Sequence, residues 1–462
     1  RLFWTVVTLV SLLTVYYQWE NRRSARELVE ARAEMIALIG TDNISDIIPP
    51  QLTDETNFFA LPAIAVWKTD ATHHLIPENA FWPEKLPKPE LIETDDGNGS
   101  HVNWSKWAAN RDLKGGTPAQ ALHRELGDDA QSLLLELAAG LDRPFSCLKP
   151  TQRDVLEAAN GDFISMAIPS IPGLNDRHRE LALRLRAAAH AGDPAQAQTL
   201  ARILLRLFPE SSATHGTLVG SLVSIATHES AFEALQDALK CPVWDERGLT
   251  LLQAQLAKEN DLVVTRRAFT LEMLWGHAQL SRHRGNVVRW QLTPFLKMLY
   301  DEPNWTAMWM ILGPVGWQDA DAAQHLRYWC EIIGPEDELA WTQTSAVTKR
   351  IEREVRQELY LVQDMIPNPR RFLGSVLIPN LGNVYAAAAE TLFRRRCLIL
   401  ACELEKHRLR HGVYPSALPV LSGFETHDPA RPKQPLGYRL QKDGYVLTSA
   451  HEGWLWRMKR TP

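Results

Sequence analysis

The sequence predicts a mainly α-helical fold: a helical-hairpin array with one N-terminal transmembrane helix and a small C-terminal α+β module. Three observations predict it. The chain begins with an uncharged apolar run at Leu2–Trp19, its middle repeats apolar residues at steps of three and four, and Gly444–Ser449 has the pattern of a β-strand. At 462 residues the chain is too long for one ordinary core, so we expect two or three domains.

The composition is that of a globular protein, with 45% hydrophobic and 23% charged residues, and the formal net charge is −5. A nucleic-acid-binding body is expected to be basic, so nucleic acid is not an expected partner. The cysteines form no CxxC pair and are odd in number, so we expect buried free thiols rather than a disulfide framework. They are Cys147, Cys241, Cys330, Cys397 and Cys402.

The first expected element is a membrane anchor. The run Leu2–Trp19 is about 18 residues long, and Trp4, Tyr16, Tyr17 and Trp19 lie near its ends, where interfacial aromatic belts are found. No small-residue cleavage site follows, so we prefer a retained signal anchor to a cleaved signal peptide. No second apolar run of this length follows, so we expect the N-terminus inside the cytoplasm and the bulk of the chain outside it.

Four regions are expected along the chain. Residues 1–40 form the transmembrane anchor and a juxtamembrane helix that ends at Gly40. Residues 41–117 form an irregular segment rich in Pro and Trp, packed on a neighbour and with room for short strands. Residues 118–380 form a helical-hairpin domain, and residues 381–462 form a long helix followed by short antiparallel strands.

The helical middle contains one clear hairpin unit, Leu181–Leu239. Breaks at Gly192-Asp193-Pro194 and Pro209–Ser212 separate its antiparallel helices, and the first hairpin looks like a tetratricopeptide unit. A regular 34-residue period does not repeat, so we predict a hairpin array rather than a solenoid. The many tryptophans of this region are interpreted as core residues, with a ligand-stacking groove as the alternative.

The last region begins with an amphipathic helix. One stripe is apolar (Ala389, Phe393, Cys397, Leu400, Leu404), and the opposite face is charged (Arg394, Arg395, Glu403, Lys406, Arg410). Gly412 is the expected C-cap and Pro415 prevents continuation. The strands Pro435–Gln441 and Gly444–Ser449 follow, joined through the turn Lys442-Asp443-Gly444.

This order of residues resembles the C-terminal part of type II secretion pseudopilins. The matching residues are Gly412, Tyr414, Pro415, Leu418, Leu421, Asp428, Pro429, Tyr438, Tyr445, Val446, Leu447 and Ser449. The whole chain is similar to an uncharacterised family of membrane-anchored bacterial proteins that pairs this ending with a helical middle, here at Gly192-Asp193, Thr217–Ala226 and Phe232–Leu239. The resemblance implies a bacterial inner-membrane protein, single-pass, with a periplasmic body.

The chain departs from the pseudopilin pattern at both ends. No processed, Glu-bearing apolar helix precedes the anchor, and the residues after Ser449 lack the run of carboxylates that calcium requires. Neither polymerisation nor calcium binding is therefore expected.

No catalytic, cofactor-binding or metal-ligating residue is predicted. The side chains of the adjacent residues His73 and His74 are expected to point in different directions, which does not suit a shared metal ion. The stretch Asp95–Ser100 lacks the position-six Gly and the terminal Glu of a calcium loop. The SxxK string Ser146–Lys149 has no SDN or downstream KTG partner. His407 and His411 flank a charged helix end and its cap, and are interpreted as such rather than as metal ligands.

We therefore expect a non-catalytic, membrane-anchored envelope scaffold that binds other proteins, with the lipid bilayer as a second partner through Leu2–Trp19. One alternative is a structural or accessory subunit of a larger membrane complex or secretion machine. Another is an envelope hydrolase without a recognisable motif, whose pocket would gather several of His73, His74, His123, Asp95 and Asp96.

Overall fold

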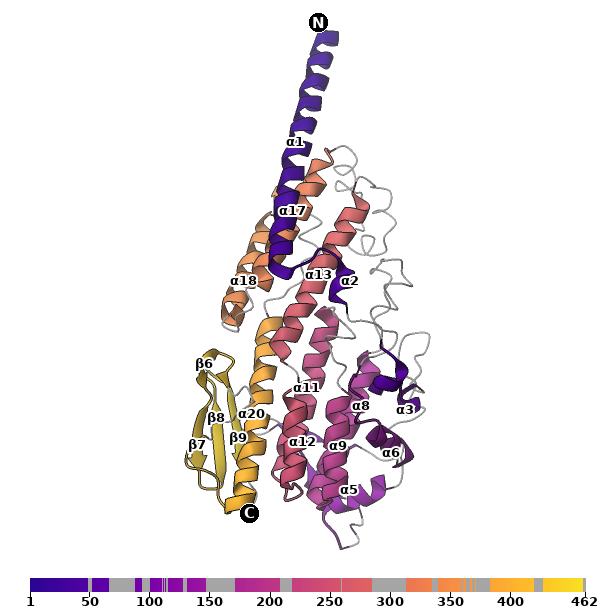
Figure 1. Ribbon diagram of the computed structural model, residues 1–462, viewed down its shortest axis with the longest axis vertical. Helices are drawn as coiled ribbons and strands as arrows, with labels where there is room; N and C mark the ends of the chain where they lie inside the picture. The colour runs from indigo at the N-terminus through magenta and orange to yellow at the C-terminus, as the bar shows by residue number, and fades with distance from the viewer. Residues whose placement is uncertain are drawn as a thin grey trace.

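The computed structural model describes residues 1–48, 52–65, 88–93, 100–109, 111, 113, 115–127, 131–146, 171–207, 218–258, 260–284, 313–334, 340–358, 360–362, 366–367, 370, 383–418 and 427–459. This part of the chain is mainly helical, with small antiparallel sheets near the C-terminus, as the sequence predicts (Figure 1).

Helix α1 (Leu2–Ile39) is one continuous helix whose first half projects beyond the rest of the molecule (Figure 1). It ends at Gly40, whose positive φ of 82° lets its N–H reach the carbonyl of Ile36. The predicted transmembrane helix within α1 is not supported, since none of the helices in the described ranges has the length and apolarity needed to cross a membrane. Hydroxyl residues at Thr5, Thr8, Ser11 and Thr14 interrupt the apolar run, and the first charged residue after Arg1 is Glu20.

The body consists of long helices packed side by side (Figure 1). They are α5 (Pro118–Leu126), α6 (Gln131–Ala139), α8 (Ile171–Ala191), α9 (Pro194–Arg206), α11 (Leu218–Leu239), α12 (Glu246–Leu256), α13 (Asp261–His283), α17 (Gly316–Ile333), α18 (Ala340–Glu358) and α20 (Val384–His411). Helix α8 contacts α5, α9 and α11, and α20 contacts α11, α12, α13 and α18. The second half of α1 packs along α17, so the chain's first helix is part of the core.

Local sequence explains where several of these helices begin. Thr117 accepts a hydrogen bond from the N–H of Gln120, and the Gln120 side chain accepts one from the N–H of Thr117, which is a capping box at the start of α5. Asp193 accepts from the N–H of Gln196 at 3.0 Å and begins α9 directly after Gly192. The predicted hairpin break at Gly192-Asp193-Pro194 is therefore confirmed, and α5 begins at Pro118, the first residue of the predicted helical-hairpin region.

The described residues of region 41–117 form short elements, as expected from its prolines. They are α2 (Ile44–Ile47), the 3-10 turns η1 (Asp54–Thr56) and η2 (Phe58–Ala60), α3 (Pro62–Ala65), the paired strands β1 (Leu91–Glu93) and β2 (Ser100–Val102), and α4 (Trp104–Ala108). Phe58, Phe59 and Trp107 are buried against the helices. The described part of this segment thus packs on the helical body.

The C-terminal part contains most of the strands. β3 (Tyr360–Val362) pairs with β4 (Ile366–Pro367), and β5 (His427–Asp428) pairs with β6 (Arg431–Pro435). β7 (Gly437–Gln441), β8 (Gly444–Thr448) and β9 (Leu455–Lys459) form one antiparallel sheet in the order β7-β8-β9. Gln441 lies opposite Gly444, so the predicted hairpin at Lys442-Asp443-Gly444 is confirmed, whereas the third strand β9 was not predicted.

The sheet packs its inner face on α20. Tyr445, Leu447, Trp456 and Met458 belong to the same core as the predicted apolar stripe of α20, all of whose members are at most 1% exposed. The prediction that α20 is an amphipathic helix needs a correction on its opposite, charged face. Arg395 and Lys406 lie on it and are 3% and 8% exposed, because other helices cover that face as well.

The described cysteines are buried or half-buried, and the described tryptophans range from fully buried to exposed. Cys241, Cys397 and Cys402 are buried free thiols and Cys330 is a half-buried one, while Cys147 lies outside the described residues. Trp329 is fully buried, in edge-to-face contact with Phe269. Trp329 agrees with the interpretation of the tryptophans of the helical middle as core residues, whereas Trp275 and Trp317 are half-buried and Trp290, Trp305 and Trp309 lie outside the described residues.

Candidate functional site

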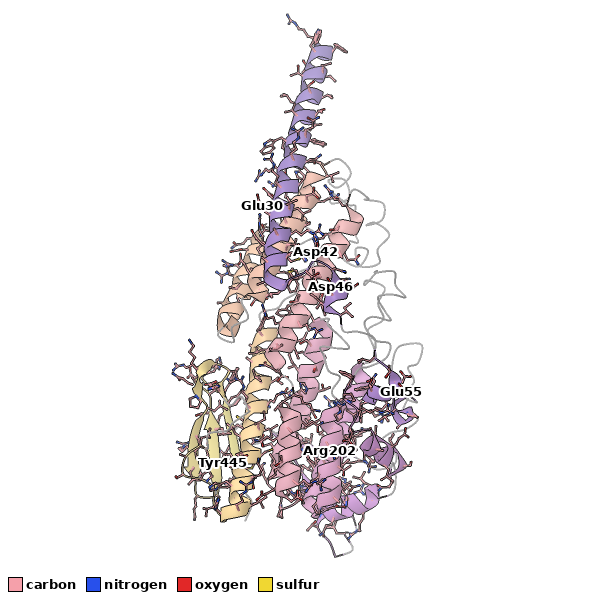
Figure 2. All side chains as sticks on the ribbon, in the orientation of Figure 1. Glu30, Asp42, Asp46, Glu55, Arg202 and Tyr445 are labelled. Carbon is pink, nitrogen blue, oxygen red and sulfur yellow. The ribbon has the colours of Figure 1, made fainter. Side chains whose placement is uncertain are left out.

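The two halves of α1 have opposite exposure. Between residues 3 and 19 Tyr17 is half-buried, and the other large apolar side chains are 38% to 70% exposed: Phe3, Trp4, Val6, Val7, Leu9, Val10, Leu12, Leu13, Val15, Tyr16 and Trp19. Figure 2 shows the side chains of this half with no other element around them. From residue 20 onward one face is buried, and Glu20, Ser24, Ala31 and Met35 are at most 1% exposed. We call residues 3–19 the projecting segment.

Three threonine hydroxyls of the projecting segment are bonded within the helix. The hydroxyls of Thr5, Thr8 and Thr14 each donate to the carbonyl four residues earlier, at 3.2, 2.8 and 2.8 Å. Such back-bonding gives the hydroxyl a partner within its own helix. The segment therefore presents an apolar surface whose threonine hydroxyls already have partners.

The second half of α1, from residue 20 onward, which we call the embedded half, is held at its first residues by polar contacts. The carboxylate of Glu20 lies 3.0 Å from Nε of Arg370, and Oδ1 of Asn21 accepts a hydrogen bond of 2.7 Å from the N–H of Gly316. A Cβ added to Gly316 would lie 2.8 Å from the Cα of Asn21. Glycine is therefore required where the start of α17 meets the backbone of α1.

Aromatic and basic side chains lie at the boundary between the projecting segment and the embedded half of α1. The guanidinium of Arg23 lies 5.4 Å from the ring centre of Trp19 and pairs with Glu27 at 2.9 Å. The rings of Tyr16 and Trp19 are 6.3 Å apart. Amphipathic rings with a cation beside them are typical of the level at which an apolar phase meets water.

Inside the body, α8 and α11 share a buried ion pair that sequence reasoning missed. Nε2 of His190 lies 3.0 Å from Oδ2 of Asp237, and the thiol of Cys241 also hydrogen-bonds His190. Burial opposes the imidazolium, but these two bonds outweigh it and raise the pKa of His190 to about 10. Burial likewise opposes the Asp237 carboxylate, but the bond to His190 and the charge of Arg186 lower its pKa to about 2.

Arg186 extends this cluster toward β2. Its side chain is 2% exposed, its Nη2 donates to Oγ of Ser100 at 3.1 Å, and it lies 3.8 Å from the carboxylate of Glu233. Burial lowers the pKa of Arg186, while the charges of Asp237 and Glu233 oppose that effect. The cluster consists of alternating charges and joins β2, α8 and α11.

A second buried network joins α11, α13 and α20. Arg395 forms a two-armed ion pair with Asp261, and Nη2 of Arg395 lies 3.3 Å from Nε2 of His228. A guanidinium only donates, so Nε2 of His228 accepts and its Nδ1–H faces Oδ1 of Asp261 at 3.2 Å. Burial opposes the charge of Asp261, but Arg395 and His228 hold the pKa of this carboxyl well below its usual range. These side chains are at most 4% exposed, which suits a structural role.

Of the residues considered from sequence for a hydrolase pocket, the structure describes only His123. His123 lies 3.2 Å from the helix-capping residue Asp193, whereas His73, His74, Asp95 and Asp96 lie outside the described residues. Asp428 accepts hydrogen bonds from Ser449 Oγ at 2.7 Å and from the N–H of Ala430 at 2.9 Å. Its carboxylate therefore holds the chain after β8 in place.

Neither buried cluster had a local signal in the sequence. His190 and Asp237 are separated by 47 positions, and Asp261 and Arg395 by 134. Only the crossing of distant helices pairs them.

No family model, no curated protein and no solved structure matches the chain. The resemblance of its C-terminal segment to pseudopilins stays a prediction.

Proposed function

We propose that this protein is a non-catalytic, membrane-attached scaffold of the bacterial cell envelope that binds other proteins. The projecting segment inserts into the lipid bilayer, and the helical body, on the periplasmic side of the inner membrane, receives the partners. The observation that carries the proposal is the abrupt change along α1, from exposed apolar side chains up to Trp19 to buried polar contacts from Glu20 onward.

The size of the exposed apolar surface supports an interaction role. Eleven large apolar side chains lie exposed in succession on the projecting segment, from Phe3 to Trp19. Apolar surface in water is unfavourable in proportion to its area, so a contiguous patch of this kind marks a site for a membrane or another protein.

The chemistry of the segment favours lipid as the occupant. In a bilayer each polar group requires an internal partner, and the hydroxyls of Thr5, Thr8 and Thr14 have theirs. After Arg1 the next charged residue is Glu20, and the rings of Tyr16 and Trp19, with Arg23 over the Trp19 ring, lie at the level of the headgroups.

A second candidate function is a structural or accessory subunit of a larger membrane complex. Small residues let helices approach closely within a membrane, and Thr5, Thr8, Ser11 and Thr14 are exposed along the projecting segment. In this case the segment would pack among the helices of a partner protein, and lipid alone would not bind it.

Flotation with vesicles of phosphatidylcholine and phosphatidylglycerol separates the two candidates. We expect the full chain to float with the vesicles and the double variant Leu9→Asp, Leu12→Asp to remain at the bottom. Val29→Asp is the matched control, because Val29 is 69% exposed on the embedded half of the same helix. A wild-type chain that remains at the bottom contradicts insertion into lipid.

The scaffold role and the orientation have separate tests. Detergent extraction from the native host, followed by mass spectrometry, should recover stoichiometric partner proteins, and a lone monomer would contradict both candidates. Protease added to spheroplasts should digest the body, whereas full protection would overturn the periplasmic location.

A further inference from the structure

Two histidines lie against each other at the C-terminal end of α20. The ring centres of His407 and His411 are 4.4 Å apart, with their planes at 44°. His407 is half-buried and His411 is exposed, so solvent reaches this pair on one face of the helix. The interpretation of both residues as parts of a charged helix end does not account for this contact.

A backbone carbonyl sets the tautomer of His407. Nδ1 of His407 lies 3.0 Å from the carbonyl oxygen of Val413. A carbonyl only accepts, so Nδ1 carries the hydrogen and the lone pair is left on Nε2. Gly412, with φ 78°, turns the chain so that Val413 lies beside the last turn of α20. A histidine whose second nitrogen donates to a backbone carbonyl is the usual arrangement for a metal ligand.

The surrounding charges permit a cation. The nearby guanidinium of Arg410 is paired with Glu246 at 2.9 and 2.8 Å, and that of Arg408 with Glu405 at 2.8 Å. The pair also lies at the C-terminal end of a 28-residue helix, where the backbone dipoles favour positive charge.

We propose that His407 and His411 form a two-histidine chelate for a divalent transition-metal ion of the Zn²⁺, Cu²⁺ or Ni²⁺ class. Two histidines four apart on one helix face are an arrangement that holds zinc in proteins. Imidazole suits these ions, whereas Mg²⁺ and Ca²⁺ prefer oxygen ligands. Over the described ranges no group of three His, Cys, Asp or Glu side chains forms a metal site, so water fills the remaining positions of this chelate. The site is independent of attachment through α1.

Calorimetric titration of the full chain with ZnCl₂ tests the chelate. We expect a saturable one-to-one site whose affinity falls about 100-fold in either His407→Gln or His411→Gln, because each variant converts a two-point attachment into a one-point attachment. His101→Gln is the matched control, since His101 is an exposed histidine on β2, and it should retain the site. MgCl₂ should give no binding.

Electron paramagnetic resonance with Cu²⁺ gives a second readout that the stability of the protein does not affect. The wild-type chain should show coupling to two imidazole nitrogens, and His411→Gln to one. Zinc binding that is unchanged in both single variants places the ion elsewhere and overturns the inference, as does the absence of saturable binding in the wild-type chain.

Discussion

Arg395 on α20 and Asp261 at the start of α13 form a two-armed ion pair, with Nε–Oδ2 at 2.8 Å and Nη2–Oδ1 at 3.0 Å. Arg395 also donates to the carbonyl of Leu256 at 3.2 Å, so a single guanidinium fastens the end of α12, the start of α13 and the middle of α20. His228 on α11 bridges both partners.

Replacing Arg395 with Leu should lower the free energy of unfolding by about 3–5 kcal/mol, because Asp261 is left as a buried charge without its main partner. The midpoint of urea denaturation measures the change. The exposed pair of Arg410 and Glu246 has similar two-armed geometry, so Arg410→Gln is the control and should leave the midpoint nearly unchanged. Equal effects of the two substitutions would contradict the structural importance of the buried pair.

Replacing Gly316 with Ala should lower stability by about 1–3 kcal/mol and loosen the embedded half of α1, since the new Cβ meets backbone of that helix at 2.8 Å. Hydrogen exchange of the α1 amides after Glu20 measures the loosening. Val315→Ala is the neighbouring control, because Val315 is 39% exposed. Unchanged exchange in Gly316→Ala would contradict the close approach of α1 and α17.

The pair His190–Asp237 predicts that the free energy of unfolding falls at both ends of the pH range, which gives its pH profile two limbs. The pKa of His190 is raised from 6.5 to about 10, so its contribution is complete below pH 6.5 and is lost as pH rises through about 10. The pKa of Asp237 is lowered from 3.8 to about 2, so its contribution is present above pH 3.8 and is lost as pH falls through about 2.

Urea unfolding across the pH range should therefore show both limbs in the wild-type chain and a flatter profile in Asp237→Asn. His123→Gln is the control, because the pair of His123 with Asp193 is more exposed. If the stability of Asp237→Asn changes with pH as much as that of the wild-type chain, groups other than His190 and Asp237 cause the pH dependence.

Replacing Tyr445 with Phe should leave stability unchanged or increase it. The Tyr445 side chain lies on the sheet beside α20 (Figure 2), and its buried hydroxyl has no hydrogen-bond partner in the described part of the protein. Tyr438→Phe is the matched comparison, because the Tyr438 hydroxyl donates to the carbonyl of Pro415 at 2.7 Å, and it should cost about 1 kcal/mol. Thermal denaturation measures both. A larger loss in Tyr445→Phe would indicate a bound partner for that hydroxyl.

The local pattern of residues was sufficient for those features that depend on neighbours along the chain. The hairpin break at Gly192, the end of α20 at Gly412 and the turn between β7 and β8 were all predicted, because each depends on a few adjacent residues. The strand β9 was not predicted. Its pairing with β8 depends on the chain returning to the sheet after Ser449.

The charged residues show most clearly what the sequence left open. Arg394 and Arg395 are adjacent on α20 and were placed together on one charged face, yet Arg394 is half-buried among the carboxylates Glu229, Glu233 and Glu390 while Arg395 is fully enclosed. Periodicity reports which side chains share a helix face, but whether a second helix covers that face depends on distant segments.

By itself, the sequence determined that the protein is mainly helical, where several helices start and stop, and that an uncharged apolar run opens the chain, because these follow from local backbone preferences and composition. Only the tertiary structure decided that this run stays exposed up to Trp19 and that the helix enters the body at Glu20. Only it paired His190 with Asp237 and Asp261 with Arg395, and set the tautomer of His407. Those relationships are contacts between separate segments, and burial and charge pairing arise only when the chain folds back on itself.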